Sequence, residues 1–227
     1  EEWENVQIIF ATSAGDVRRN ALSDFTNVRA NGKIAMDLPE NVELVNARIA
    51  TQDDDVMLVT KSGRAIRFST NAVRVFKGRK STGVRGVRLT GDDCVVSMSI
   101  LRHFEASSDE RAAYLKMRRA VAGMVDDEGA GTEDEEVSAN ATISPERYAE
   151  MSAAENLILT ISSRGSGKLS SSHDYPVRGR GGMGVAAMDK AMRGGDLVAS
   201  FPVDLEDQIM LATSKGQSIR VPIEGIS

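Results

Sequence analysis

The residues with the most chemical potential in this sequence are arginines and lysines set among glycines between residues 56 and 91. The stretch has no aspartate or glutamate, and its nine cations are Lys61, Arg64, Arg67, Arg74, Lys77, Arg79, Lys80, Arg85 and Arg88. Arginine and lysine neutralise phosphates without reading a base sequence, and glycine lets a backbone approach a phosphate closely. The pattern predicts a surface for a nucleic-acid backbone, against the alternative that these side chains only keep the protein soluble.

The kind of nucleic acid is indicated by what accompanies the cations. Aromatic residues make up only 4% of the chain, and few stand near the basic residues. Single-strand binding relies on bases stacking on aromatic side chains, so this composition argues against it. A curved basic rim suits duplex DNA, where extra contacts repay the elastic cost of bending.

Catalysis and metal binding find little support in the residues. The two histidines, His103 and His173, lie in no recognisable triad or metal motif, and three consecutive aspartates at 53–55 are more typical of a solvated turn. The glycine-rich run at 179–184 lacks the spacing of a phosphate-binding P-loop. We expect this chain to be non-catalytic by itself, with no metal and no cofactor of its own.

The cations must be positioned by a hairpin that recurs along the chain. Each copy has an apolar run, a serine-bearing turn that ends in glycine, and a basic residue three or four positions later. The turn glycines are Gly15, Gly63, Gly165 and Gly216, at intervals of 48, 102 and 51 residues. Repeats of about 40 to 50 residues are typical of four-stranded propeller blades. The sequence predicts an all-β fold of propeller-like blades of about 50 residues.

The doubled interval predicts an insertion at residues 104–155. This segment carries 13 acids and 5 bases, in a chain whose formal net charge is −5. Helices are expected over 108–121 and from Ser144-Pro145, because serine caps helices and proline suits the first turn. The spacer at 126–136 holds seven acids and argues against a packed core there. We expect a helical hairpin or an arm, a solvated decoration that a short linker could replace without loss of folding.

Length and composition bound the remaining possibilities. With 227 residues, one cysteine (Cys94) and no apolar run long enough to span a membrane, the chain is expected to be cytoplasmic, without disulfides. We expect one domain in three parts: residues 1–103 form blades one and two, residues 104–155 the insertion, and residues 156–227 blade three and the start of blade four.

Four fragments carry a family resemblance: residues 10–15 (FATSAG), 22–25 (LSDF), 81–89 (STGVRGVRL) and 207–213 (DQIMLAT). They resemble the blades of the C-terminal domain of the DNA gyrase A protein. That resemblance implies a β-pinwheel with strands exchanged between blades, and duplex DNA wrapped around its basic edge. It further implies a part of a bacterial type II topoisomerase that introduces negative supercoils, with ATP and Mg used by other parts. The implied partners are the rest of the gyrase A protein and the gyrase B protein in a heterotetramer, associated with the nucleoid.

The family's box, Gln-Arg-Arg-Gly-Gly-Lys-Gly, is absent as such. Degenerate versions occur at residues 81–86 and 180–184, where Met183 stands in place of the lysine. Their glycines are Gly83, Gly86, Gly181, Gly182 and Gly184. The alternatives are the C-terminal domain of the related topoisomerase IV protein, and a protein-binding propeller that docks through the acidic insertion.

Over all four copies, the predicted DNA-contacting cations follow each turn glycine or lie in each glycine segment. They are Arg18, Arg19, Arg29, Lys33, Arg64, Arg67, Arg74, Lys77, Arg79, Lys80, Arg85, Arg88, Lys168, Arg178, Arg180, Lys215 and Arg220.

Overall fold

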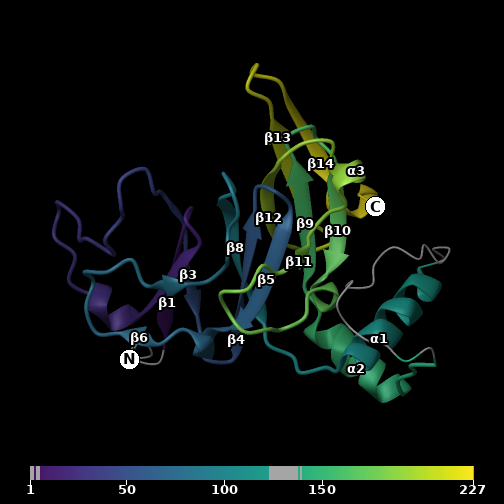
Figure 1. Ribbon diagram of the computed structural model, residues 1–227. Coiled ribbons are helices and arrows are strands. Elements are labelled where there is room, and N and C mark those ends of the chain that lie inside the picture. Colours follow the sequence, from purple (N-terminus) through teal and green to yellow (C-terminus); the bar gives the residue numbers. More distant parts are fainter. Residues whose placement is uncertain (1–2, 4–5, 123–137, 139, 227) are drawn as a thin grey trace.

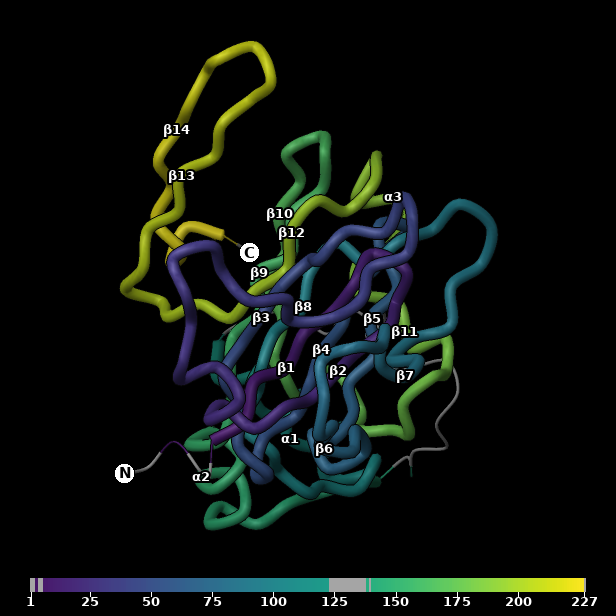
Figure 2. Tube along the Cα trace, turned by 90° about the vertical axis from the view of Figure 1, so that its left-hand side faces the viewer, coloured from purple at the N-terminus to yellow at the C-terminus, as the bar shows by residue number. Residues whose placement is uncertain are grey.

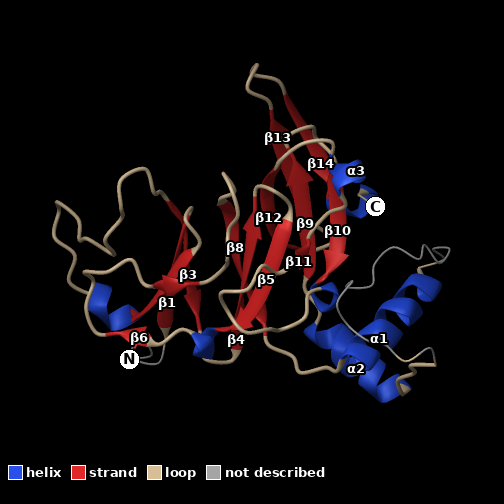
Figure 3. Cartoon of the chain, viewed as in Figure 1, coloured by secondary structure: helices blue, strands red, loops and turns tan. Residues whose placement is uncertain are grey.

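Hairpins follow one another along the chain and fan out side by side in the computed structural model (Figure 1). The structure describes residue 3, residues 6–122, residue 138 and residues 140–226. Strands dominate, and helices are concentrated at one edge of the fan (Figure 3). Among the described residues, none of the helices combines the length and apolar character that crossing a bilayer requires.

Each of the first three hairpins gains a third strand, and we call the three strands together a unit; the fourth hairpin alone is unit 4. In unit 1, β1 (Gln7–Thr12) pairs antiparallel with β2 (Asp16–Ala21) on one edge and with β3 (Leu44–Ala50) on the other. Units 2 and 3 follow the same plan, with β4 (Asp54–Thr60), β5 (Arg64–Ser69) and β8 (Val95–Arg102) in unit 2, and β9 (Leu157–Ser162), β10 (Gly167–Ser171) and β12 (Leu197–Val203) in unit 3. Unit 4 is the hairpin of β13 (Gln208–Ala212) and β14 (Ser218–Pro222).

The four hairpin turns have one construction. In each, the glycine amide donates to the carbonyl of the residue three positions earlier at 3.0 Å, and the glycine has φ between +81° and +96°. The amide that follows the glycine donates to a threonine or serine hydroxyl at 3.2 Å in all four turns. A residue with a Cβ is strained at such a φ, so the shared glycine has a structural cause.

Short strands from one unit complete the sheet of the preceding unit. β6 (Val75–Phe76) and β7 (Val84–Arg85), which follow the unit 2 hairpin, pair with β2 of unit 1. β11 (Val185–Ala186), which follows the unit 3 hairpin, pairs with β5 of unit 2. The expected exchange of strands between blades is therefore present.

The core lies between the units, because the central strands are buried on both faces. Alternate residues of β4 point to opposite sides: Val56 and Leu58 join the cluster shared with unit 1, while Met57 and Val59 join the cluster shared with unit 3. Leu159 and Ile161 of β9 pack with Ile223 of unit 4. A strand covered on both faces reads as a continuous apolar run, as in residues 56–59.

The insertion contains two of the helices. α1 (Ser108–Val121) begins at a capping box in which Ser107 and Glu110 each satisfy a backbone amide of the other. α2 (Pro145–Ala154) has Ser144 as its N-cap and proline in its first turn. Both helices were expected from the sequence, and the acidic spacer at 126–136 lies outside the described residues.

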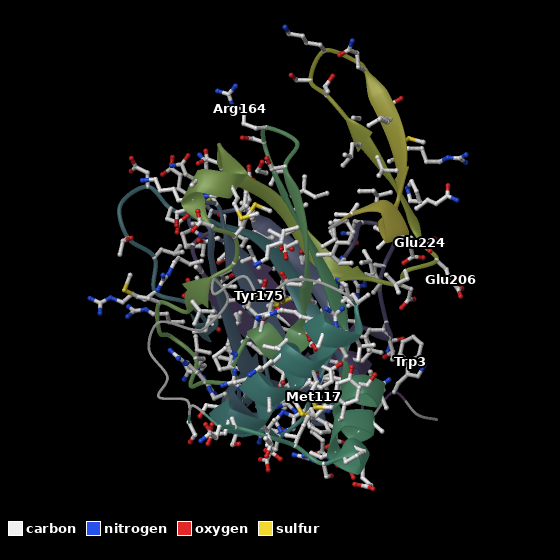
Figure 4. All side chains as sticks on the ribbon, turned by 90° about the vertical axis from the view of Figure 1, so that its right-hand side faces the viewer. Trp3, Met117, Arg164, Tyr175, Glu206 and Glu224 are labelled. Atoms are coloured by element: carbon white, nitrogen blue, oxygen red, sulfur yellow. The ribbon has the colours of Figure 1, made fainter. Side chains whose placement is uncertain are left out.

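The described part of the insertion is packed against unit 3, contrary to the expectation of a solvated decoration. His173, in the 3₁₀ turn η3 (Ser172–Asp174), is 2% exposed and donates from Nε2 to the Met151 carbonyl at 2.8 Å. Its ring meets the edges of Phe104 and Tyr114, with centroids 5.7 and 5.0 Å away. Tyr114 and Met151 are buried in the insertion's own apolar cluster, and His173 of unit 3 contacts both of them. Tyr175, which follows η3, lies in the middle of the molecule, whereas Arg164 stands at the tip of the β9–β10 turn (Figure 4).

Candidate nucleic-acid interface

The basic segment at residues 77–88 lies along unit 1, although it belongs to unit 2. Gly83 has φ +95°, and a Cβ on it would lie 2.2 Å from the carbonyl oxygen of Val17. Gly184 repeats the arrangement one unit later, where a Cβ would lie 2.1 Å from the Ala65 carbonyl oxygen. These glycines let one unit's backbone pass close to its neighbour's. Their role in the structure is thus packing between units, where the sequence had suggested close approach to phosphates.

The two box-like segments meet each other. The amide of Gly181 donates to the carbonyl of Gly86 at 2.6 Å, and the amide of Arg88 donates to the carbonyl of Gly182 at 2.8 Å. Arg180 Nη1 donates to the carbonyl of Arg85 at 3.0 Å. β7 and β11 also lie close together in Figure 2. The basic segments of units 2 and 3 therefore form one continuous surface.

The exposed cations of this surface form what we call the basic rim: Arg74, Lys77, Lys80, Arg85, Arg88 and Arg180. Arg74 stacks over the Phe76 ring at 4.0 Å, which leaves its guanidinium at the surface. Burial raises the pKa of Asp16 in β2, while the charge of Arg85 opposes that rise. Of the other predicted cations, Arg29, Lys215 and Arg220 are exposed but lie outside the two segments that meet.

A second group is half-buried: Lys33, Arg64, Arg79, Lys168 and Arg178. Arg64 Nη2 donates to the Gly184 carbonyl at 2.7 Å, and Arg79 Nη1 donates to the Ile34 carbonyl at 2.6 Å. Lys33 Nζ donates to the carbonyl of Asp24. Several of these cations therefore brace loops as well as adding charge.

Three predicted contacts require correction. The side chains of Arg18, Arg19 and Arg67 are only 1%, 6% and 3% exposed, and each guanidinium is hydrogen-bonded to protein. Arg67 Nε meets Asp55 Oδ2 at 2.8 Å, and His103 Nδ1 lies 2.8 Å from the other carboxylate oxygen. Burial lowers the pKa of Arg67, and the charge of Asp55 opposes this shift. In this conformation none of the three can reach a phosphate.

A second site is not indicated by the other features of the described residues. A polar pocket of about 810 Å³ separates unit 2 from the insertion, with Arg67, His103, Arg111 and Arg147 among its lining residues. Two of its arginines are held by carboxylates: Arg67 by Asp55, and Arg147 by Glu110 and Glu150. Within the described ranges, no group of three or more His, Cys, Asp and Glu side chains is placed to hold a metal ion.

Comparison with known proteins supports the repeat structure. A family model described as DNA gyrase C-terminal domain, beta-propeller, matches residues 7–51, 54–102, 156–201 and 207–227. Among solved structures, the C-terminal domain of DNA topoisomerase IV has a TM-score of 0.68 at 18% identity, covering 98% of this chain and 54% of that one. The E. coli ParC C-terminal domain has a TM-score of 0.57 at 14% identity, covering 97% and 71%. At these identities the likeness shows the fold alone.

Curated relatives are more similar in sequence. The DNA gyrase A protein of Granulibacter bethesdensis is 47% identical over 235 residues, which cover 99% of this chain and 25% of the relative. The corresponding gyrase protein of Rickettsia bellii is 39% identical over 230 residues, covering 100% and 25%. The chain thus spans about a quarter of the length of the curated relatives it matches. With most of its repeats matched by the family model, the chain belongs to the DNA gyrase C-terminal domain family, with its beta-propeller fold.

Proposed function

We propose that this chain binds duplex DNA without sequence preference and bends it around the basic rim, as the wrapping module of a DNA gyrase A protein. The observation that carries the proposal is the junction of two basic segments, where Arg85 and Arg180 from successive units are joined by a hydrogen bond of 3.0 Å. A duplex that follows this junction would stay in contact with cations from one unit to the next.

The expected energetics follow from the exposed charges. The basic rim has six exposed cations, and each phosphate neutralised contributes about 0.9 to the slope of log affinity against log salt. A duplex in contact with all six would give a slope of about −5. Smooth bending of a site of 20–30 base pairs by 40–90° costs on the order of 1–6 kcal/mol, which a row of phosphate contacts can repay.

In the whole enzyme, we propose that the wrap introduces a positive DNA crossing, which supports negative supercoiling driven by ATP. Cleavage of the strands, ATP and Mg would belong to other parts of the gyrase A protein and to the gyrase B protein in a heterotetramer, in the bacterial cytoplasm on nucleoid DNA. The curated relatives support gyrase over topoisomerase IV, since those at 47% and 39% identity are both named as the A protein of DNA gyrase.

Wrapping, as distinct from simple binding, is tested by closing a nicked plasmid with DNA ligase in the presence of the chain. A wrap with a positive crossing raises the linking number of the closed and deproteinised plasmid, and the rise grows with the amount of protein bound. The matched control is K77A/K80A/R85A/R88A, which keeps the glycines and loses rim charge. An unchanged linking number under saturating binding contradicts wrapping. Absence of DNA binding would favour a propeller that docks on proteins.

A further inference from the structure

One position of the repeat holds an arginine that is buried in units 1 and 2 and exposed in unit 4. The arginine comes four positions after the turn glycine, and its neighbour on the paired strand comes eight positions before that glycine. In units 1, 2 and 4 the arginine accompanies a side chain that can accept a hydrogen bond, whereas unit 3 has leucine at both places. The pairs are Gln7 with Arg19, Asp55 with Arg67, Leu157 with Leu169, and Gln208 with Arg220.

In unit 1 this arginine holds the next unit. Arg19 Nη1 donates to the carbonyls of Thr70 and Val73 at 2.9 and 3.1 Å, and Arg19 Nη2 donates to Gln7 Oε1 at 2.8 Å. Thr70 and Val73 belong to the 3₁₀ turn η2 (Thr70–Ala72) and its C-cap. The Arg19 backbone also stands opposite Val75 in the β2–β6 pairing. One guanidinium therefore joins its own hairpin to the turn that precedes the rim.

Unit 2 repeats this arrangement with Arg67. Its Nη1 donates to the Ser172 carbonyl at 2.8 Å, its Nη2 to the Arg102 carbonyl at 2.9 Å, and its Nε to Asp55 at 2.8 Å. Ser172 lies seven residues after its turn glycine, as Thr70 does. The Arg67 backbone forms a parallel bridge with Val177, as Arg19 does with Val75.

The leucine pair of unit 3 explains when arginine is used. At the junction of units 3 and 4, Leu157 and Leu169 pack with Ile223 and Ile226, which stand where Thr70 and Val73 stand in unit 2. The polar pairs of units 1 and 2 thus meet turn carbonyls, and the apolar pair of unit 3 meets apolar side chains. The two kinds of junction show that the arginine matches its neighbour's turn and is not a general surface charge.

The turns whose carbonyls accept hydrogen bonds from Arg19 and Arg67 are also the starting points of the basic segments. Arg74 follows Val73 directly, and Lys77 and Lys80 come within the next seven residues. Two neighbours of Arg19 on β2 also bind the basic segment. Arg18 Nη1 donates to the Ser81 carbonyl at 2.6 Å, and Asn20 Nδ2 donates to the Phe76 carbonyl at 3.0 Å.

We propose that Arg19 and Arg67 are positioning residues for DNA binding. Each guanidinium holds the turn from which the next unit's basic segment starts, and so places that segment's cations on the basic rim. This inference rests on the proposed function, because it concerns the same DNA surface. It assigns two buried arginines a role in binding without any contact with DNA.

The slope of log affinity against log salt separates this role from the alternatives. Loss of a direct phosphate contact lowers its magnitude by about 0.9 at most. Displacement of residues 74–85 would remove several contacts together, so R19L should lower the magnitude by about 2 to 4. R19K should behave like R19L, since an ammonium group cannot reproduce the fork that reaches three acceptors. K77A is the control for one lost contact.

The experiment compares wild type, R19L, R19K, the transplanted pair Q7L/R19L and K77A by DNA titration over a range of salt, each below its melting transition. Hydrogen exchange without DNA gives a second reading. Peptides covering residues 70–88 should exchange at least about tenfold faster in R19L, while those covering residues 172–188 stay unchanged. R67L should show the reverse pattern.

Four results would overturn the proposal. A slope change of about 0.9 in R19L, the loss of a single contact, or recovery in R19K, would make Arg19 a phosphate contact. An unchanged slope with faster exchange would limit it to the fold. Unchanged hydrogen exchange of residues 70–88 in R19L would show that Arg19 does not restrain the turn η2. Failure of every Arg19 and Arg67 variant to fold would limit the two arginines to a role in folding. If DNA binding by the wild type does not depend on salt, the proposed function is refuted. The hydrogen-exchange data, which need no DNA, still show whether Arg19 restrains residues 70–88.

Discussion

Replacing Gly83 with alanine tests whether the basic segment must lie directly against unit 1. The residue has φ +95°, and the new Cβ would stand 2.2 Å from the Val17 carbonyl oxygen, which is a backbone atom. Val17 pairs with Val84, so the strand β7 must move off β2 before alanine can fit. The substitution therefore acts on the placement of the rim without changing any charge.

The size of the effect follows from three contributions. A left-handed φ costs an L residue about 1–2 kcal/mol, and alanine's smaller freedom in the unfolded chain returns about 0.4–1 kcal/mol. Displacing β7 removes hydrogen bonds between β2 and β7, each with a net value of about 0.5–1.5 kcal/mol. We expect G83A to lower the free energy of unfolding by about 2–4 kcal/mol. It should also weaken duplex binding, because the rim cations next to β7 move with the strand.

Two glycines of the chain serve as matched controls in urea unfolding followed by circular dichroism. Gly32 has φ +79° and open space around its Cβ position, so G32A carries only the backbone term of about 1 kcal/mol. Gly78 has neither a positive φ nor a neighbour within 4 Å, and G78A should stay within about 0.5 kcal/mol of wild type. Equal losses in G83A and G32A would refute the close approach of the two units. G184A should behave like G83A one unit later.

Three further predictions concern the rest of the chain. Burial lowers the pKa of His173 below its usual 6.5, with Arg67 and Arg111 acting in the same direction, and with the Met151 carbonyl and Glu155 opposing. The unfolded chain then binds a proton that the folded chain does not, so the free energy of unfolding should fall below about pH 6.5 by up to about 1.4 kcal/mol per pH unit. The contribution of His173 to the free energy of unfolding is complete above about pH 6.5. It is measured as the difference in free energy of unfolding between wild type and H173Q at each pH. M151A should cost about 2–5 kcal/mol in urea unfolding and the exposed M117A control less than about 0.5. K77A/K80A should change stability by less than about 1 kcal/mol while it weakens DNA binding.

Each of these has a contradicting result. A stability difference between wild type and H173Q that stays constant from pH 7.5 to 5.5 would place no titration at that residue. Equal effects of M151A and M117A would show that α2 contributes nothing to the core. A large loss of stability in K77A/K80A would give the rim cations a structural role.

Local signals in the sequence predicted local structure well. The hairpin turns depend on one glycine and one hydroxyl within five residues, and the expected helix over 108–121 coincides with α1, whose start depends on Ser107 and Glu110. The insertion's docking was missed, because it depends on His173, which lies 22 residues beyond its partner Met151 and carries no motif.

Which cations face inward was beyond the reach of composition and spacing. The partner of Arg19 in the next unit is Thr70, 51 residues away, so charge patterning within one hairpin does not show that the side chain is engaged. One signal was available. Arg18 and Arg19 are adjacent on a strand, so they point to opposite faces, and a strand covered on both faces must bury both. The same reasoning separates the buried pair from Lys77 and Lys80, which lie in a loop.

The most direct test of the account is the salt dependence of duplex binding, measured for the whole chain on two unrelated DNA sequences. Six rim cations predict a slope of log affinity against log salt of about −5, equal affinities for the two sequences, and a slope of about −2 in K77A/K80A/R85A/R88A. A slope near zero in wild type, an unchanged slope in the fourfold variant, or a strong preference for one sequence would contradict a DNA surface at the basic rim.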